Sequence, residues 1–149
     1  MTDIRFYHLQ TQTLEQALPK LLMKAYGTEK KIVVKAADDK QVEALNQLLW
    51  TFHPNVFLPH GSKKDGYAEL QPIWLTDRDE NPNKGEILIL TNGTQSENLA
   101  DYEMCCDMFN GFDDSSVKAA RTRWKAHKDA GHNLTYWQQT DQGGWEQKA

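Results

Sequence analysis

The clearest indication of the fold is the stretch KIVVKAADDKQVEALNQLLWTF, which occupies residues 31–52. Its apolar run Ile32-Val33-Val34 is short and is typical of a buried strand. Further along, apolar side chains recur at the spacing of one helix face, at Val42, Leu45, Leu48, Leu49 and Phe52. Asp38 or Asp39 can cap the first turn of that helix. The stretch therefore predicts a strand followed directly by an amphipathic helix.

The preceding residues show the same succession of strand and helix. Residues 4–9 are aromatic and apolar enough for a strand. A helix is predicted after them from apolar positions at Leu14, Leu18, Leu21, Leu22 and Ala25. Thr13 is its predicted N-cap and Gly27 its predicted end, and Pro19 inside it allows a kink or a later start. Strand, helix and strand joined by short connections predict a right-handed βαβ unit and a parallel sheet.

The second half of the chain contains further elements. Residues 73–75 and 86–91 are predicted strands, and the polar segment 77–85 between them is interpreted as a solvated loop. Residues 102–109 fit a strand or a short helix, and the pattern does not decide between them. A last helix is predicted over residues 113–130, with acidic caps at its start and a glycine at its end.

These elements, within 149 residues, predict one α/β domain with a mainly parallel central sheet flanked by helices. The domain is expected to span residues 1–137. Residues 138–149 are polar except for Trp145 and are predicted to form a loosely ordered tail. The sequence leaves open whether Trp145 docks on the domain.

Composition limits the class of protein. The chain has 17 Lys and Arg against 21 Asp and Glu, and this net charge of −4 disfavours binding to nucleic acid through its phosphates. No apolar run approaches the about 18 residues of a membrane span, and the start of the chain lacks the features of a signal peptide. We therefore expect a cytoplasmic protein, in which the adjacent Cys105 and Cys106 are reduced thiols of unassigned role.

The motifs of common small α/β enzymes are missing. The loop after the first predicted strand, residues 8–13, contains no glycine, so neither the dinucleotide fingerprint nor a phosphate-binding loop is present. The five histidines show no metal-ligand spacing, and no Gly-x-Ser-x-Gly turn occurs. The charged cluster Asp77, Asp79 and Glu80 is interpreted as part of a solvated loop. We expect no catalytic residue, no cofactor and no metal.

The predicted last helix is basic, although the chain as a whole is acidic. Its basic residues are Lys118, Arg121, Arg123, Lys125 and Lys128. Four of them, at i, i+3, i+7 and i+10 counted from Lys118, share one face, which Trp124 can border. This arrangement suits a peptide or ligand that carries carboxylates and an apolar side chain. In the alternative interpretation the cations only face water and the other side is a buried stripe. That stripe would consist of Val117, Ala120, Trp124, His127 and Leu134.

A segment rich in aromatic residues and prolines, residues 49–60, follows the second predicted helix. It contains Trp50, Phe57 and Pro59, and an exposed cluster of this kind marks a partner interface. The alternative, in which Trp50 and Phe57 fill the core, is equally consistent with the pattern.

Two longer patterns are more specific than the single residues. They are Leu-Trp-(x)6-Phe-Leu-Pro-His at residues 49–60 and Arg-x-Arg-Trp-Lys-(x)4-Ala-Gly at residues 121–131. Other characteristic segments are Arg5-Phe-Tyr7, Gln71-Pro-Ile-Trp74, Ile87-Leu-Ile-Leu90 and Leu134-Thr-Tyr-Trp-Gln-Gln139. In this order and spacing, the segments resemble the family of the chi subunit of the bacterial DNA polymerase III holoenzyme over nearly the whole chain.

The resemblance implies a Rossmann-like α/β fold without a working nucleotide site. It also implies a non-catalytic subunit of a DNA-directed DNA polymerase, a nucleotidyltransferase complex of DNA replication. Chi-like proteins link the clamp loader, through the psi subunit, to the single-stranded DNA-binding protein, whose acidic C-terminal tail ends in Pro-Phe. By motif match, Arg121, Trp124 and Lys125 are the residues that bind this tail. Arg123 and Lys128 are added to the site because of their charge and their place on the helix.

The resemblance assigns a second partner as well. Trp50, Phe57 and Pro59 match the region that receives psi, and we expect a monomer or a one-to-one heterodimer with psi. Contact with DNA would be indirect, and no membrane is involved. Two other functions stay open at this point. One is a small nucleotide-binding α/β enzyme, which the glycine-free loop disfavours, and the other is a direct binder of single-stranded nucleic acid through Trp124 and the basic helix, which the net charge disfavours.

Overall fold

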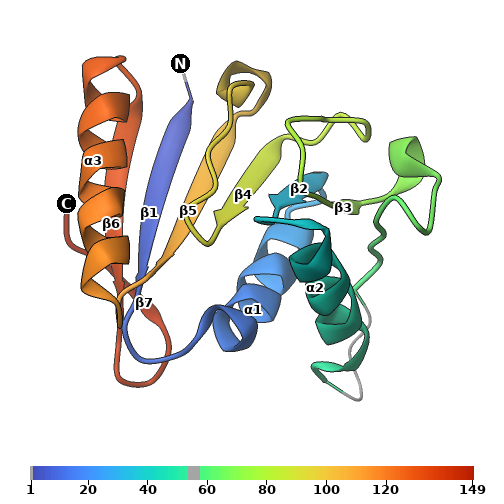
Figure 1. Ribbon diagram of the computed structural model, residues 1–149, viewed down its shortest axis with the longest axis horizontal. Helices are drawn as coiled ribbons and strands as arrows, with labels where there is room; N and C mark the ends of the chain where they lie inside the picture. The colour runs from blue at the N-terminus through green and yellow to red at the C-terminus, as the bar shows by residue number, and fades with distance from the viewer. Residues whose placement is uncertain (1, 54–57) are drawn as a thin grey trace.

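The computed structural model describes residues 2–53 and 58–149, which form a seven-stranded sheet flanked by three α-helices (Figure 1). The strands are β1 (Asp3–Leu9), β2 (Ile32–Lys35), β3 (Ile73–Thr76), β4 (Ile87–Thr91), β5 (Met104–Asn110), β6 (Asn133–Gln139) and β7 (Trp145–Gln147). The helices are α1 (Leu14–Tyr26), α2 (Asp39–Thr51) and α3 (Asp114–Asp129), with short 3-10 helices at Ala68–Leu70 and Leu99–Asp101. Within the described residues, no helix is both long enough and apolar enough to cross a membrane.

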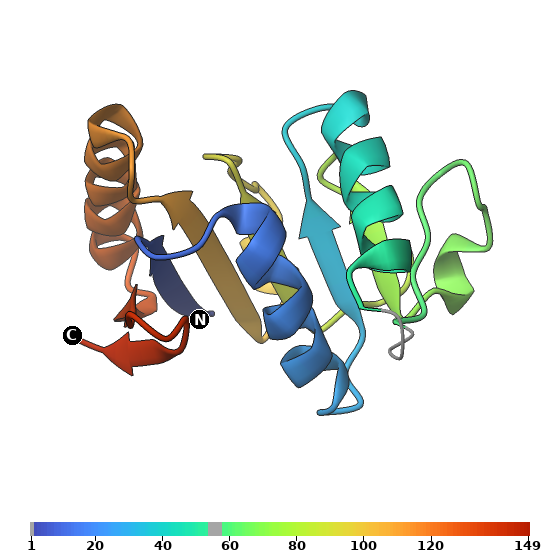
Figure 2. The same ribbon diagram turned by 90° about the horizontal axis from the view of Figure 1, so that it is seen from below.

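The strand order is β3-β2-β4-β5-β1-β6-β7, and all neighbours are parallel except the antiparallel pair β6 and β7. Helices α1 and α2 lie on one face of the sheet and α3 lies on the other (Figures 1 and 2). Tyr7 and Leu9 of β1 belong to the core beneath α1 and α2. Ile4 and Phe6 belong to the core beneath α3, because successive side chains of a strand point to opposite faces. The sheet thus separates two apolar cores.

The fold class predicted from the sequence is confirmed, since the domain is α/β with a mainly parallel sheet between helices. Thr13 is the N-cap of α1, and its N–H donates to Oε1 of Gln16 over 3.0 Å. At the start of α2 the N–H of Gln41 donates to the side chain of Asp38 over 2.8 Å. Pro19 lies within α1 without ending it. The predicted parallel relation of the first two strands holds, but β4 and β5 lie between them.

The segment that fits either a strand or a helix, residues 102–109, contains the central strand β5. This strand pairs with β1 and β4, and its residues 105–109 are all buried. A strand buried on both faces shows no alternation of polar and apolar residues, which is why its pattern is ambiguous. Cys105 and Cys106 are free thiols that point into the two different cores, and burial raises the pKa of Cys106 to about 12.

The end of the chain is more ordered than the sequence predicts. Gln138 and Gln139 belong to β6, and Trp145–Gln147 form β7 beside it. The Trp145 ring meets the Tyr7 ring edge-on, with ring centroids 4.8 Å apart. The prediction of a loose tail from residue 138 is corrected for these residues, because strand pairing and the burial of an aromatic ring hold them on the domain.

Candidate functional site

Helix α3 crosses the sheet face opposite α1 and α2 and connects β5 to β6 (Figure 1). Ala120 on its inner side is buried, and the half-buried side chains beside it include Val117, Trp124 and His127. The Trp124 ring meets the Phe6 ring of β1 edge-on, with centroids 5.3 Å apart and 73° between the ring planes. A largely buried stripe therefore exists on the inner side of α3, but Leu134, which the sequence also places in it, belongs to β6.

Arg123 lies on this inner side and not among the exposed cations. Its side chain is 6% exposed and makes two hydrogen bonds to the buried Asp107 of β5. Nε donates to Oδ2 over 2.7 Å and Nη2 donates to Oδ1 over 3.1 Å. Its assignment to the tail-binding set is thus corrected, because its side chain is buried and the Nε–Nη2 edge of its guanidinium is engaged by a buried carboxylate. Its position three residues after the buried Ala120 places it toward the sheet.

The other four basic residues of α3 are exposed. They are Lys118, Arg121, Lys125 and Lys128. None of the four makes an ion pair with any residue in the described ranges. The predicted cationic face is therefore present next to the buried stripe, and its charges are available to an anionic ligand.

A cavity of about 360 Å³ opens between α3 and the sheet. Its lining is mainly aromatic and includes Phe6, His8, Phe109, Trp124 and Tyr136. Arg121 lines the same cavity while its side chain is exposed. A guanidinium thus stands beside an aromatic hollow, an arrangement that can receive a ligand's aromatic ring together with an adjacent carboxylate.

His8 and Tyr136 are joined by a hydrogen bond on the sheet side of the cavity, with 2.5 Å between Nδ1 and the hydroxyl oxygen. Gln138 Nε2 donates to the same hydroxyl over 3.1 Å, so the hydroxyl links His8 to Gln138. Burial, and after it the charge of Arg121, lowers the pKa of His8. At neutral pH the imidazole is therefore uncharged, and Arg121 is the cation of the cavity.

Gly111, directly after β5, lies in close contact with Leu9 and His8 at the end of β1. A Cβ at this position would lie 2.1 Å from the carbonyl oxygen of Leu9 and 2.2 Å from Cδ2 of His8. The N–H of Gly111 donates to that same carbonyl over 2.7 Å. Only glycine allows the two chain segments to approach this closely.

Sequence reasoning did not single out His8, Phe109 or Tyr136 as site residues. The one indication in the sequence is strand alternation, which places His8 on the same face of the first predicted strand as Phe6. The other two join them through strand pairing, since His8 lies opposite Phe109 and Phe6 lies opposite Tyr136. A single sequence does not show which distant strands flank the first one.

Of the residues expected to receive a second partner, Trp50 belongs to the last turn of α2, and this helix lies toward the opposite end of the sheet from α3 (Figure 1). Trp50 is 50% exposed, and its ring centroid lies 4.9 Å from that of the buried His60. Pro59, the neighbour of His60 in the chain, is half-buried. Phe57 lies outside the described residues. The interpretation of Trp50 as a core residue is therefore wrong, because half of its surface faces solvent.

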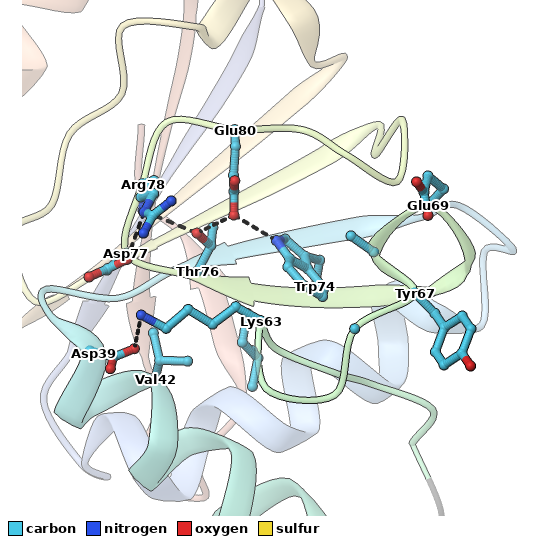
Figure 3. Close-up of a pocket in the computed structure, with 13 residues that line it drawn as sticks. Asp39, Val42, Lys63, Tyr67, Glu69, Trp74, Thr76, Asp77, Arg78 and Glu80 are labelled. Atoms are coloured by element: carbon cyan, nitrogen blue, oxygen red, sulfur yellow. Dashed lines mark hydrogen bonds and ion pairs between the residues drawn. The ribbon is translucent and has the colours of Figure 1, made fainter.

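A second hollow, of about 310 Å³, lies where β3 ends beside the start of α2 (Figure 3). Glu80 accepts two hydrogen bonds there through Oε1, from Nε1 of Trp74 over 3.0 Å and from Oγ1 of Thr76 over 2.7 Å. Glu80 is therefore a structural anchor for the loop after β3, although the sequence suggested only a solvated charge.

The charges of this hollow do not favour a phosphate group. Its lining contains four acidic side chains and two basic ones, Lys63 and Arg78. Lys63 pairs with Asp39 over 3.1 Å, and Arg78 pairs with Asp77 over 3.9 Å (Figure 3). The geometry at this end of the sheet thus gives no support to the nucleotide-binding alternative.

Comparison with known proteins indicates the same family as the sequence motifs do. The family model described as DNA polymerase III chi subunit, HolC, matches residues 1–135. The probable DNA polymerase III subunit chi of Rickettsia prowazekii (strain Madrid E) is 36% identical over 94 residues, which are 63% of this chain and 57% of that protein. The DNA polymerase III subunit chi of Escherichia coli (strain K12) is 26% identical over 144 residues, which cover 90% of this chain and 96% of that protein. The matched residues include all of α3.

Proposed function

This chain belongs to the family of the DNA polymerase III chi subunit, and from that premise we propose that α3 binds the acidic C-terminal tail of the single-stranded DNA-binding protein. The family makes the chain an accessory subunit of the polymerase in DNA replication. The tail site and its partner are the finer part of the proposal. They rest on the chemistry of α3 and of the cavity beneath it.

The observation that carries the proposal is the position of Arg121 at the aromatic cavity. A tail that ends in phenylalanine presents a ring and a carboxylate on the same residue. The ring would enter between Phe6 and Trp124, and the planar guanidinium would form two parallel hydrogen bonds to the carboxylate. No acidic side chain in the described residues competes for Arg121.

The exposed lysines extend the site along the helix. Lys125 lies one turn after Arg121, and Lys128 lies almost one further turn along the same face. They would meet the acidic side chains that precede the terminal phenylalanine. Because these contacts are exposed, they would be screened by salt over about 10 Å near 0.1 M. They contribute chiefly to steering the tail toward the cavity.

The second half of the proposal is that the surface around Trp50 and Pro59 receives the psi subunit and thereby the clamp loader. Supporting this, Trp50 exposes half of its aromatic surface, and aromatic anchors of this kind dominate protein interfaces. The end of α2 and the outer face of α3 lie at opposite ends of the sheet (Figure 2). A partner at one of them would leave the other accessible, as an adaptor requires.

The experiment that tests the tail site is a titration of the tail peptide into the purified protein, followed by tryptophan fluorescence at about 0.05 M and about 0.3 M salt. We expect saturable binding that weakens with salt and is lost when the final phenylalanine of the peptide is deleted. A peptide whose affinity does not depend on that residue would contradict the role of the cavity. Binding of a single-stranded oligonucleotide in place of the peptide would instead favour the direct nucleic-acid binder.

A further inference from the structure

Another hollow lies on the other face of the sheet, between α1 and the β6–β7 hairpin. We call it the α1 groove; its volume is about 800 Å³. Its floor consists of strand residues such as Tyr7 and Ile89, and Leu21 and Met23 of α1 form one wall. Figure 2 shows α1 on this face of the sheet, with β7 beyond it at the edge of the sheet. The groove is separated from the α3 cavity by the sheet itself.

Two tryptophans form the wall opposite α1. Trp137 comes from β6 and Trp145 from β7, and both rings are half-buried against Tyr7, with centroids 6.2 Å and 4.8 Å from its ring. Half-buried indoles pack firmly yet retain an exposed surface for a ligand. Both tryptophans lie beyond residue 135, where the family model ends. The match to the family model therefore does not include these two tryptophans.

The charges that line the α1 groove are all positive. Its lining contains Arg5, Lys20 and Lys24 and no acidic residue. None of these three cations forms an ion pair within the described ranges. The Arg5 guanidinium lies over the Trp137 ring, 5.5 Å from its centroid. On a chain of net charge −4, three unpaired cations around an apolar groove are complementary to an acidic ligand.

We propose that the α1 groove binds an acidic peptide segment of a partner protein, anchored by a large apolar side chain. The anchor would lie between Met23 and Trp145, and acidic side chains on either side of it would reach Lys20 and Lys24. These two lysines are four residues apart on α1 and therefore point the same way. A nucleic acid fits less well, because a strand of phosphates needs a longer row of cations than this groove provides.

The test is a selection of short random peptides displayed on phage against the Arg121→Ala, Lys125→Ala double variant. This background removes the proposed tail site, so the result does not depend on that proposal. We expect the recovered peptides to combine acidic residues with an aromatic or a large aliphatic one. In direct titrations, Lys20→Glu together with Lys24→Glu should weaken a synthetic copy of such a peptide at least about tenfold, because like charges now face each other. The matched control Lys40→Glu, on the exposed side of α2, should leave its affinity unchanged.

The proposal fails if no peptide is recovered, if the recovered peptides show no acidic bias, or if charge reversal at Lys20 and Lys24 has no effect. If an oligothymidylate bound and charge reversal abolished this binding, the groove would be a nucleic-acid site and the proposal would be wrong. A concentration-dependent dimer that sedimentation detects and the same charge reversal dissociates would also contradict the proposal. Simultaneous binding of the tail peptide and a selected peptide to the unmodified protein would show that the two sites are independent.

Discussion

The guanidinium of Arg123 and the carboxylate of Asp107 form a two-point ion pair in the interior, at 2.7 Å and 3.1 Å. The pair joins α3 to β5, which lies in the middle of the sheet. The edge-on contact of Trp124 with Phe6 joins α3 to β1 in the same way. The helix that carries the proposed tail site is thus fixed by contacts on its inner side, and its outer cations are left for a partner.

Removal of the buried guanidinium should destabilise the domain strongly. Arg123→Met leaves the carboxylate of Asp107 buried without a cation, which costs about 3–5 kcal/mol in comparable buried pairs. Urea denaturation would measure this loss. The double variant Arg123→Met, Asp107→Leu should recover most of the stability, because no buried charge remains. Equal stability of wild type and Arg123→Met would contradict the structural role of the pair.

The same variant should respond to pH in a defined direction. Burial raises the pKa of Asp107 in the folded wild type, and the pairing with Arg123 opposes this. Without Arg123 the folded pKa rises further above its unfolded value, so the folded state takes up a proton that the unfolded state lacks. Arg123→Met should therefore lose stability relative to wild type as the pH rises from about 4 toward 7. A pH-independent difference in the free energy of unfolding would contradict this.

Tail binding should be coupled to protonation of His8. Burial and the charge of Arg121 lower the pKa of His8 in the free protein. A carboxylate bound at Arg121 would raise that pKa again, so binding takes up protons and affinity increases as the pH falls from about 7.5 to about 6. Calorimetry in buffers of different ionisation enthalpy would measure the proton uptake. His8→Leu should abolish it, and uptake that persists in this variant would assign the effect to another group.

The outer lysines should affect the rate of encounter more than the lifetime of the complex. Lys125→Ala and Lys128→Ala each remove one exposed charge, worth about 0.2–1 kcal/mol in surface pairs. We expect a slower association rate, a weaker dependence on salt and a nearly unchanged dissociation rate, measured by stopped-flow fluorescence. A large increase in the dissociation rate would show that these lysines are buried in the complex.

Trp145 should contribute to stability, because it packs against Tyr7 and carries the last strand. Trp145→Ala should lower the free energy of unfolding by about 1–3 kcal/mol, less than for a fully buried tryptophan. The neighbouring exposed residue supplies the control, Glu146→Ala, which should have little effect. Equal stability of the two variants would restore the interpretation of residues 138–149 as a loose tail.

Much of the fold could be predicted from periodicity and caps. The apolar positions after Thr13 and after Asp38 indicate α1 and α2 because helix faces repeat every three to four residues. The strand at residues 102–109 stayed ambiguous because both of its faces are buried. The order of residues 138–149 could not be predicted, because one tryptophan among polar residues gives no periodic signal. The contact that holds Trp145 joins it to Tyr7, which is almost the whole chain length away in sequence.

The site could be predicted only in part, because several of its residues come together through contacts between segments that are far apart in the sequence. Arg121 and Lys125 follow from helical spacing, and the structure shows them exposed. The charge of Arg123 alone does not show where its side chain points, because its buried partner Asp107 lies 16 residues earlier, on β5. The contribution of His8 and Tyr136 depends on β6 pairing with β1, which the sequence does not reveal.

The most direct test of the account is the affinity of the tail peptide for Arg121→Ala, compared with wild type and with Lys40→Ala. Lys40 is an exposed lysine on α2, away from the cavity. Loss of a charge-assisted hydrogen bond of about 1.5–3 kcal/mol predicts at least about tenfold weaker binding by Arg121→Ala, with an unchanged melting temperature. Lys40→Ala should bind as wild type does. Equal affinity of all three proteins for the peptide would contradict the central claim that Arg121 and the cavity beside it form the tail site.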